Sequence, residues 1–199
     1  LTSRGSLSIR TDLAFARLAL SKEAEAIDGL RRVLEDAPSH MQAGMTLSTL
    51  LLRRGEFDEV IRIAKGLLQA NPKNIIARNL LATAQFRSGK RKEAKAIWER
   101  IAKAEPGFIP TRVNLAKIDL MEGRRPAARD RLLAILQDQP EHAGMMLELA
   151  RMAEQDGELK LAVEWVEKAL AVQPKSIPAV VHLIRLRLNA NEVDLALRV

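Results

Sequence analysis

Residues 109–142 read IPTRVNLAKIDLMEGRRPAARDRLLAILQDQPEH, and the proline near the end of this stretch belongs to a regular series. Prolines recur at intervals of 34 residues, at Pro38, Pro72, Pro106, Pro140 and Pro174. A sequence period between about 20 and 50 residues is typical of solenoids and repeat arrays. The stretch therefore predicts that the chain is a row of equivalent structural units.

The other residues follow the same register when each repeat begins three residues after such a proline. Position 7 is then leucine in all six repeats, from Leu13 to Leu183. Position 15 is glycine in four repeats, and positions 8 and 20 are mostly alanine. The register predicts a tail at residues 1–6 and a solenoid at 7–199, with repeats 7–40, 41–74, 75–108, 109–142 and 143–176 and a partial repeat 177–199.

Each recurring position has a physical reason. Glycine suits the left-handed residue that ends a helix, which predicts a turn at Gly55, Gly89, Gly123 and Gly157. Small side chains at positions 8 and 20 allow two helices to approach closely, and the proline at position 32 ends the second helix. Each repeat is therefore predicted to be an antiparallel helical hairpin, and the fold class to be all-α.

Composition limits the classes of protein that this chain can represent. Hydrophobic residues make up 47% and aromatic residues only 3%, so we expect a folded chain with an aliphatic core. Cysteine is absent, which excludes disulfides and thiolate chemistry. No apolar stretch of about 20 residues occurs that could span a membrane. The chain begins with Leu1 and stops midway along a predicted helix, so we expect it to be part of a longer protein.

The sequence contains no arrangement of residues that predicts catalysis. It has no phosphate-binding loop, no dinucleotide-binding fingerprint and no nucleophile elbow. The histidines, His40, His142 and His182, are too far apart in the register to predict a metal site. The chain is therefore expected to be non-enzymatic, with no catalytic residue, cofactor or metal.

Basic residues cluster at positions 16 to 18 of the third and fourth repeats, in a chain whose net charge is +7. Binding of nucleic acid would require a continuous basic track and, for single strands, stacking aromatic residues, which are missing from this cluster. We therefore predict a solvated edge that binds no nucleic acid, with contact to an anionic lipid, polysaccharide or protein as the alternative. This basic edge consists of Lys90, Arg91, Lys92, Arg124 and Arg125.

A 34-residue helix–turn–helix repeat with these landmarks resembles the tetratricopeptide repeat (TPR) family. The resemblance covers residues 7–199 and implies a right-handed superhelical solenoid. The sequence departs from the family at its aromatic positions. Position 4 holds Arg10, Arg78 and Arg112 in three repeats, where the family often has tryptophan, and only Trp98 keeps an aromatic residue at position 24.

The resemblance also implies a concave groove that is lined by the first helix of each hairpin. Positions 5, 9, 12 and 13 share one face of that helix, because steps of three and four residues return to nearly the same angle. These positions combine apolar residues with cations, which suits a protein or extended peptide partner that carries acidic groups. Alternatively, the apolar members only pack neighbouring helices together. The predicted partner-binding residues are Met45, Thr49, Leu52, Arg53, Asn79, Thr83, Phe86, Arg87, Val113, Lys117, Leu120, Leu147, Arg151 and Arg185.

Three stretches narrow the resemblance, at residues 40–61, 108–142 and 161–188. They resemble the TPR lipoprotein of exosortase (PEP-CTERM) and exopolysaccharide systems in Gram-negative bacteria. This resemblance implies a scaffold for exopolysaccharide export or PEP-CTERM protein sorting in the periplasm or cell envelope. It implies contact with a membrane only through an anchor outside this segment. A cytosolic regulatory or adaptor module, and a substrate-holding array attached to an enzyme such as a glycosyltransferase, remain alternatives.

Overall fold

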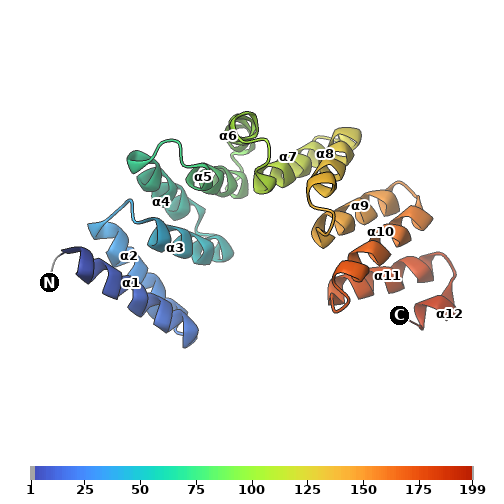
Figure 1. Ribbon diagram of the computed structural model, residues 1–199, viewed down its shortest axis with the longest axis horizontal. Coiled ribbons are helices and arrows are strands. Elements are labelled where there is room, and N and C mark those ends of the chain that lie inside the picture. The colour runs from blue at the N-terminus through green and yellow to red at the C-terminus, as the bar shows by residue number, and fades with distance from the viewer. Residues whose placement is uncertain (1–2, 199) are drawn as a thin grey trace. The chain divides into compact units, whose positions relative to one another are not determined.

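The computed structural model describes residues 3–198, with side chains from residue 7 onward, and every element in this range is an α-helix (Figure 1). The predicted all-α fold of consecutive helical hairpins is thus confirmed. None of the described helices is long and apolar enough to cross a membrane. The first helices of the hairpins are α1 (Ser3–Ala19), α3 (Met41–Arg54), α5 (Ile75–Arg87), α7 (Ile109–Met121), α9 (Ala143–Gln155) and α11 (Ile177–Asn189). The second helices are α2 (Glu23–Asp36), α4 (Phe57–Ala70), α6 (Arg91–Ala104), α8 (Arg125–Asp138), α10 (Leu159–Val172) and α12 (Val193–Ala196).

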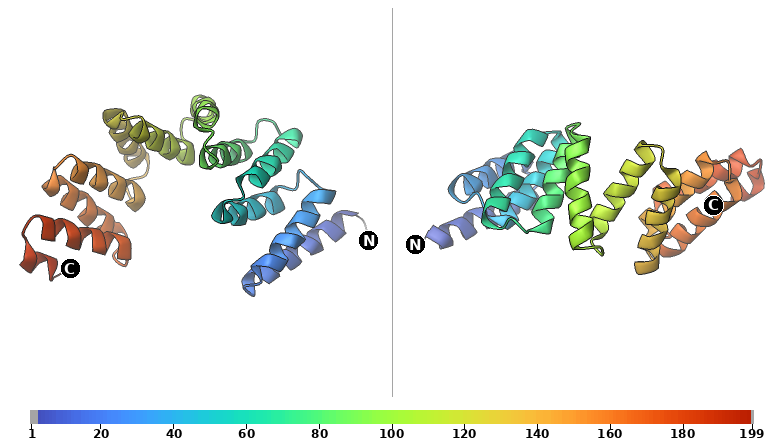
Figure 2. Two further views of the ribbon diagram at one scale, coloured as in Figure 1. Left: turned by 180° about the vertical axis from the view of Figure 1, so that it is seen from behind. Right: turned by 90° about the horizontal axis from the view of Figure 1, so that it is seen from above.

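The chain divides into two compact units, unit 1 at Leu1–Phe108 and unit 2 at Ile109–Val199. Unit 1 contains helices α1 to α6, and unit 2 contains helices α7 to α12. Within each unit, every helix packs against the next helix along the chain (Figure 2). Each unit therefore has the sequential hairpin packing that the 34-residue period predicts. A single solenoid over residues 7–199 stays a prediction.

The hairpin boundaries follow the register of the sequence. From α3 onward, each first helix begins at position 1 of its repeat, and each second helix from α2 to α10 ends two residues before the repeated proline. The N-terminus differs from the expected tail at residues 1–6, because α1 already begins at Ser3. Residues that precede a formed helix can add one more turn without a new nucleation step. Residues 1–2 lie outside the described residues.

The residues at position 15 adopt the predicted left-handed conformation. The φ angles of Gly55, Gly89, Gly123 and Gly157 lie between 75° and 87°. The equivalent residues Ser21 and Asn191 also have positive φ, at 58°. The turn between the two helices of a hairpin therefore keeps the same geometry even where the residue is not glycine.

The predicted contact between the two helices of a hairpin is present in both units. The alanine or serine at position 8 is completely or almost completely buried in each of the first five repeats, as is the alanine or valine at position 20. The leucine at position 7 is buried at Leu47, Leu115, Leu149 and Leu183. Small buried residues at positions 8 and 20 therefore bring the paired helices close together, with leucine beside them.

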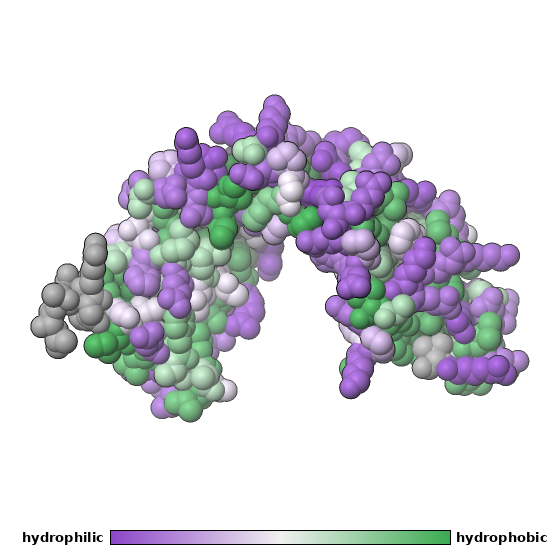
Figure 3. All heavy atoms as spheres, viewed as in Figure 1, coloured by the Kyte–Doolittle hydropathy of each residue, from purple (hydrophilic) through white to green (hydrophobic). Residues whose placement is uncertain are grey.

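Leu13 contradicts the expectation that position 7 fills a buried seam in every repeat, because 49% of its surface is exposed. In the second repeat, Leu47 of α3 belongs to a core cluster that includes Ile27, Leu30 and Val33 of α2, whereas no described helix precedes α1. Ile9 on the same helix and Leu20 in the turn that follows it are also exposed. Hydrophobic residues accordingly gather over the N-terminal helices of unit 1 in Figure 3.

Arginine at position 4 connects the two ends of a hairpin. Arg10 forms an ion pair with Asp36, and Arg112 forms the equivalent ion pair with Asp138. In the third repeat the residue equivalent to these aspartates is alanine, and Arg78 donates a hydrogen bond to the carbonyl oxygen of Pro72 instead, at 2.8 Å. These arginines therefore join the start of the first helix to the end of a second helix, at the position where the family often has tryptophan.

Candidate partner-binding surface

The predicted groove residues lie on the first helices of both units, on what we name the first-helix face. In unit 1 they belong to α3 and α5, and in unit 2 to α7, α9 and α11. Their apolar side chains are half-buried, and their cations are exposed. The half-buried apolar residues are Met45, Leu52, Phe86, Val113, Leu120 and Leu147; the exposed cations are Arg53, Arg87, Lys117, Arg151 and Arg185.

The polar residues of this face in unit 1 already have partners in their own hairpins. The hydroxyl of Thr49 donates to the carbonyl oxygen of Met45 at 2.9 Å, and that of Thr83 donates to the carbonyl oxygen of Asn79 at 2.8 Å. The side-chain oxygen of Asn79 accepts a hydrogen bond from the indole N–H of Trp98 at 2.9 Å. Asn79 thus fixes the buried Trp98 of α6 against α5, in addition to any contact with a partner.

The two unit 1 cations of the first-helix face contact neighbouring hairpins. Arg53 forms an ion pair with Glu23 of α2, with 3.5 Å between nitrogen and oxygen. The guanidinium carbon of Arg87 lies 5.2 Å from the centre of the Phe57 ring, within the range of a cation–π interaction. Arg87 also donates a hydrogen bond to the carbonyl oxygen of Leu52 at 3.5 Å. An acidic ligand would have to compete with these contacts.

In unit 2, two of the three predicted cations are likewise paired. Arg151 pairs with Glu148 at 2.6 Å, and Arg185 pairs with Glu154 at 2.9 Å. Glu154 also contacts Nε2 of the buried His182 at 2.9 Å. Among the residues that the structure describes, Lys117 forms no such pair. Lys117 therefore offers an acidic group on this face a charge that no carboxylate of the described chain has already taken.

The basic edge differs between the units. In unit 1, Lys90, Arg91 and Lys92 are exposed, and their side chains form no ion pair within the described part of the chain. In unit 2, Arg124 pairs with Glu122 and, at 2.5 Å, with the buried Asp119. Arg125 pairs with Asp156 at 2.7 Å and donates to the side chain of Gln155 at 3.0 Å.

In unit 2, Arg124 is exposed, as a solvated edge requires, but the cations of the edge are paired. There the basic side chains are neutralised by carboxylates of neighbouring helices, and Arg125 connects α8 to α9. The partners of Arg124 precede it by two and five residues in the same repeat, whereas Asp156, the partner of Arg125, stands one repeat later in the chain. Only the unit 1 part of the edge presents free cations.

Asp119 is the charged residue that the sequence reading did not single out. Its side chain is 5% exposed, and it accepts hydrogen bonds from Arg124 and, at 2.6 Å, from Arg131. Burial by itself raises the pKa of Asp119, but the hydrogen bonds from the two arginines outweigh burial and lower that pKa below its ordinary value. The signal in the sequence that could have predicted these ion pairs was the position of Asp119 in a predicted helix, a few residues before two arginines.

The three histidines lie directly before or within first helices of the hairpins. Nδ1 of His40 accepts a hydrogen bond from the backbone N–H of Ala43 at 3.3 Å and so caps α3. His142 precedes α9, and His182 lies buried beside Glu154. Within the described residues, no group of three or more His, Cys, Asp or Glu side chains is arranged to hold a metal ion.

Comparisons with known proteins give the same repeat in both units. Family models described as tetratricopeptide repeat match residues 51–110 and 113–177. No curated protein matches the sequence significantly.

Solved structures are similar in fold at low sequence identity. A tetratricopeptide repeat protein from Parabacteroides merdae has a TM-score of 0.80 at 15% identity, over 98% of this chain and 76% of that one. PilW, described as a widely conserved type IV pilus biogenesis factor, has a TM-score of 0.78 at 17% identity, over 97% and 90%. The MamA protein has a TM-score of 0.60 at 21% identity, over 78% and 85%.

Proposed function

This chain belongs to the tetratricopeptide repeat family, and we propose that it is a non-catalytic scaffold that binds an extended protein segment on its first-helix face. The observation that carries the proposal is the combination of half-buried apolar side chains and exposed cations on that face in both units. Apolar side chains that keep part of their surface exposed can gain further burial from a ligand. Exposed cations can select the charge of that ligand.

The internal ion pairs refine the kind of partner that fits. Because Arg53, Arg151 and Arg185 already have carboxylate partners and Arg87 lies over the Phe57 ring, contact with acidic groups of a ligand is concentrated at Lys117. The partner that we propose is therefore mainly apolar, with an acidic residue near α7. Binding energy comes chiefly from apolar burial against side chains such as Leu52, Phe86 and Leu120.

We further propose a role at the bacterial envelope, in exopolysaccharide export or PEP-CTERM protein sorting. The support for this role is the resemblance of residues 40–61, 108–142 and 161–188 to the TPR lipoprotein of those systems. Such a role requires a scaffold that holds proteins together, which is the activity that the first-helix face suits. The anchor that this resemblance implies belongs to a segment outside residues 1–199.

Site-specific photo-crosslinking in the native host tests the proposal. A photoreactive residue replaces Thr49 in unit 1 or Lys117 in unit 2, both exposed on first helices. The matched control replaces Lys65, which is exposed on the second helix α4. We expect the same partner to be crosslinked from Thr49 and Lys117 and not from Lys65. Adducts from Lys65 alone would place binding on the other face, and a partner confined to the cytosol would overturn the envelope role.

A further inference from the structure

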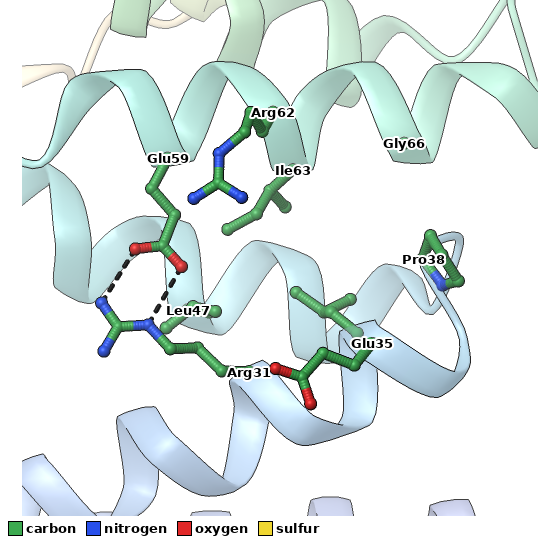
Figure 4. A pocket seen from close by; sticks show the side chains of 9 residues that line it. Arg31, Glu35, Pro38, Leu47, Glu59, Arg62, Ile63 and Gly66 are labelled. Atoms are coloured by element: carbon green, nitrogen blue, oxygen red, sulfur yellow. Dashed lines mark hydrogen bonds and ion pairs between the residues drawn. The ribbon is translucent and has the colours of Figure 1, made fainter.

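Unit 1 has a pocket between two second helices, and none of its lining residues belongs to the first-helix face (Figure 4). Its volume is about 510 Å³. The walls come from α2 and α4, the residue Pro38 closes one end, and Leu47 of α3 contributes to the lining. Leu34 and Ile63 provide half-buried aliphatic surface on the two walls. The pocket is therefore large enough for an aliphatic side chain together with the groups beside it.

Gly66 explains why the pocket opens at this junction. It occupies position 26, where other repeats have Arg32, Arg100, Ala134 and Lys168. Glycine in the middle of a helix is destabilising relative to alanine, so its presence in α4 requires a compensating reason. A Cβ atom at Gly66 would stand 3.1 Å from the carbonyl oxygen of Pro38. The glycine thus lets the turn approach α4 and leaves the neighbouring space without the long side chain that most other repeats place there.

The walls of the pocket carry two sets of charged residues, one joined by ion pairs and one not. Arg31 and Glu59 form an ion pair with each other at 2.8 Å, and Arg31 also pairs with Glu56 at 3.0 Å. By contrast, Glu35 on α2 and Arg62 on α4 are exposed, and neither forms a hydrogen bond or ion pair among the described residues. Figure 4 shows the side chains of both within the pocket lining, one from each wall. A ligand that brings one charge of each sign would satisfy both.

We propose that this pocket is a second protein-binding site, which takes an aliphatic side chain from a partner segment with an acidic and a basic residue beside it. The aliphatic side chain lies against Leu34 and Ile63, the acidic residue faces Arg62, and the basic residue faces Glu35. Charge complementarity selects this amphoteric segment over a uniformly acidic one, because a second acidic group would meet Glu35. The site is separate from the first-helix face, so a scaffold could hold two proteins at once.

Capped synthetic peptides with one central leucine serve as the probe. One series carries glutamate and lysine on opposite sides of the leucine at varied spacing, and two further series carry two glutamates or two lysines. Binding is followed by NMR of the Leu34 and Ile63 methyl groups. We expect saturable binding that is strongest in the mixed series. Replacement of the central leucine by alanine should weaken it at least about tenfold, since the buried aliphatic surface is lost.

Single charge reversals on the rim test the assigned roles. Arg62→Glu should shift the preference from the mixed series to the two-lysine series, and Glu35→Lys should shift it to the two-glutamate series. Both residues are exposed, Glu35 forms no ion pair among the described residues, and Arg62 interacts with Glu59 only through its nearby charge, so the fold should be unchanged. Unaltered preference in both variants would overturn the proposed charge recognition.

Filling the pocket provides the structural test. Gly66→Arg introduces the residue that Arg32 and Arg100 provide at the same register position, and it should abolish binding. Ala134→Arg makes the equivalent change in unit 2 and should leave binding unchanged. If Gly66→Arg fails to fold, as judged by its helicity, the two rim variants decide the matter. Absence of saturable binding for every leucine peptide at about 1 mM, the weak limit of specific recognition, would overturn the proposal.

Discussion

In unit 1, most of the buried aliphatic side chains from Ala14 to Ala84 form one cluster, whereas the buried side chains of unit 2 form smaller clusters that Trp165 borders. The buried polar residues differ as well. Among the described residues, those of unit 1 are the hydroxyl residues Thr11 and Ser48, but unit 2 buries Asp119 and His182 in addition to Thr111. Both units have the same backbone register, so the comparison shows that the repeat fixes the hairpins and leaves the interior free to vary.

The difference has a consequence for stability. An aliphatic cluster loses stability when a side chain is shortened, because burial is lost and a cavity remains. A buried carboxylate contributes only while its hydrogen-bond donors are present, and its contribution depends on pH. The two tryptophans separate the units experimentally, because Trp98 belongs to unit 1 and Trp165 to unit 2. Trp165→Phe and Trp98→Phe backgrounds therefore report on unit 1 and unit 2 respectively.

The largest expected effect is in the aliphatic cluster of unit 1. Leu47→Ala should lower the free energy of unfolding by about 2–5 kcal/mol, because Leu47 is 1% exposed and lies inside the cluster. Leu13→Ala is the matched control at the same register position and should cost less than about 1 kcal/mol, because Leu13 is largely exposed. Urea unfolding followed by Trp98 fluorescence measures both. Equal losses for the two variants would show that burial in unit 1 does not follow the structure described here.

The next effect concerns the buried carboxylate of unit 2. Asp119→Ala should lower the free energy of unfolding by about 1–3 kcal/mol, because it removes an acceptor from both Arg124 and Arg131. Glu59→Ala is the counterpart in unit 1 and should cost less than about 1 kcal/mol, because the Glu59 side chain is more exposed than that of Asp119. Trp165 fluorescence in urea reports the first change and Trp98 fluorescence the second. A greater loss at Glu59 than at Asp119 would reverse the comparison.

Lowering the pH should reduce the contribution of Asp119 to the free energy of unfolding. Because its pKa is lowered in the folded state, the unfolded chain binds the proton more readily, and stability rises with pH through this range. The contribution is complete above the ordinary Asp pKa of about 3.9 and is lost as the pH falls through the lower folded value. The difference in unfolding free energy between wild type and Asp119→Asn should therefore shrink below about pH 4. Urea unfolding of unit 2 at a series of pH values measures it, and a difference that grows towards acid pH would contradict the assignment.

The smallest effect concerns a surface ion pair in which the acidic and basic residues exchange positions between the two units. In unit 1, position 17 is Glu23 and pairs at 3.0 Å with Arg54 at position 14 of the next repeat. In unit 2, the same positions hold Arg125 and Asp156. Glu23→Arg should cost about 0.2–1 kcal/mol, and adding Arg54→Glu should restore most of the loss. A double-mutant cycle with Trp98 fluorescence measures the coupling; a coupling of zero would mean that the pair contributes nothing to joining the hairpins.

Much of the fold could be predicted from the sequence because the constraints are local and repeat. The left-handed residue at position 15, the small residues at 8 and 20 and the proline at 32 each act within one hairpin, and the structure has them as predicted. Less of the candidate site could be predicted from the sequence. The face on which Arg53, Lys117 and Arg185 lie followed from helical periodicity, but their partners could not be read from the period.

By itself, the sequence determined the register of the hairpins and the pairing of their helices from α3 onward, since backbone geometry depends on residues a few positions apart. Only the tertiary structure decided which charges remain free and where space remains between helices. Arg125 and Asp156 are 31 residues apart, and their contact depends on the packing of α8 against α9. Likewise, the pocket beside Gly66 exists because a turn from the preceding hairpin approaches α4. Such contacts join side chains from different hairpins, so their geometry is fixed only when the hairpins pack together.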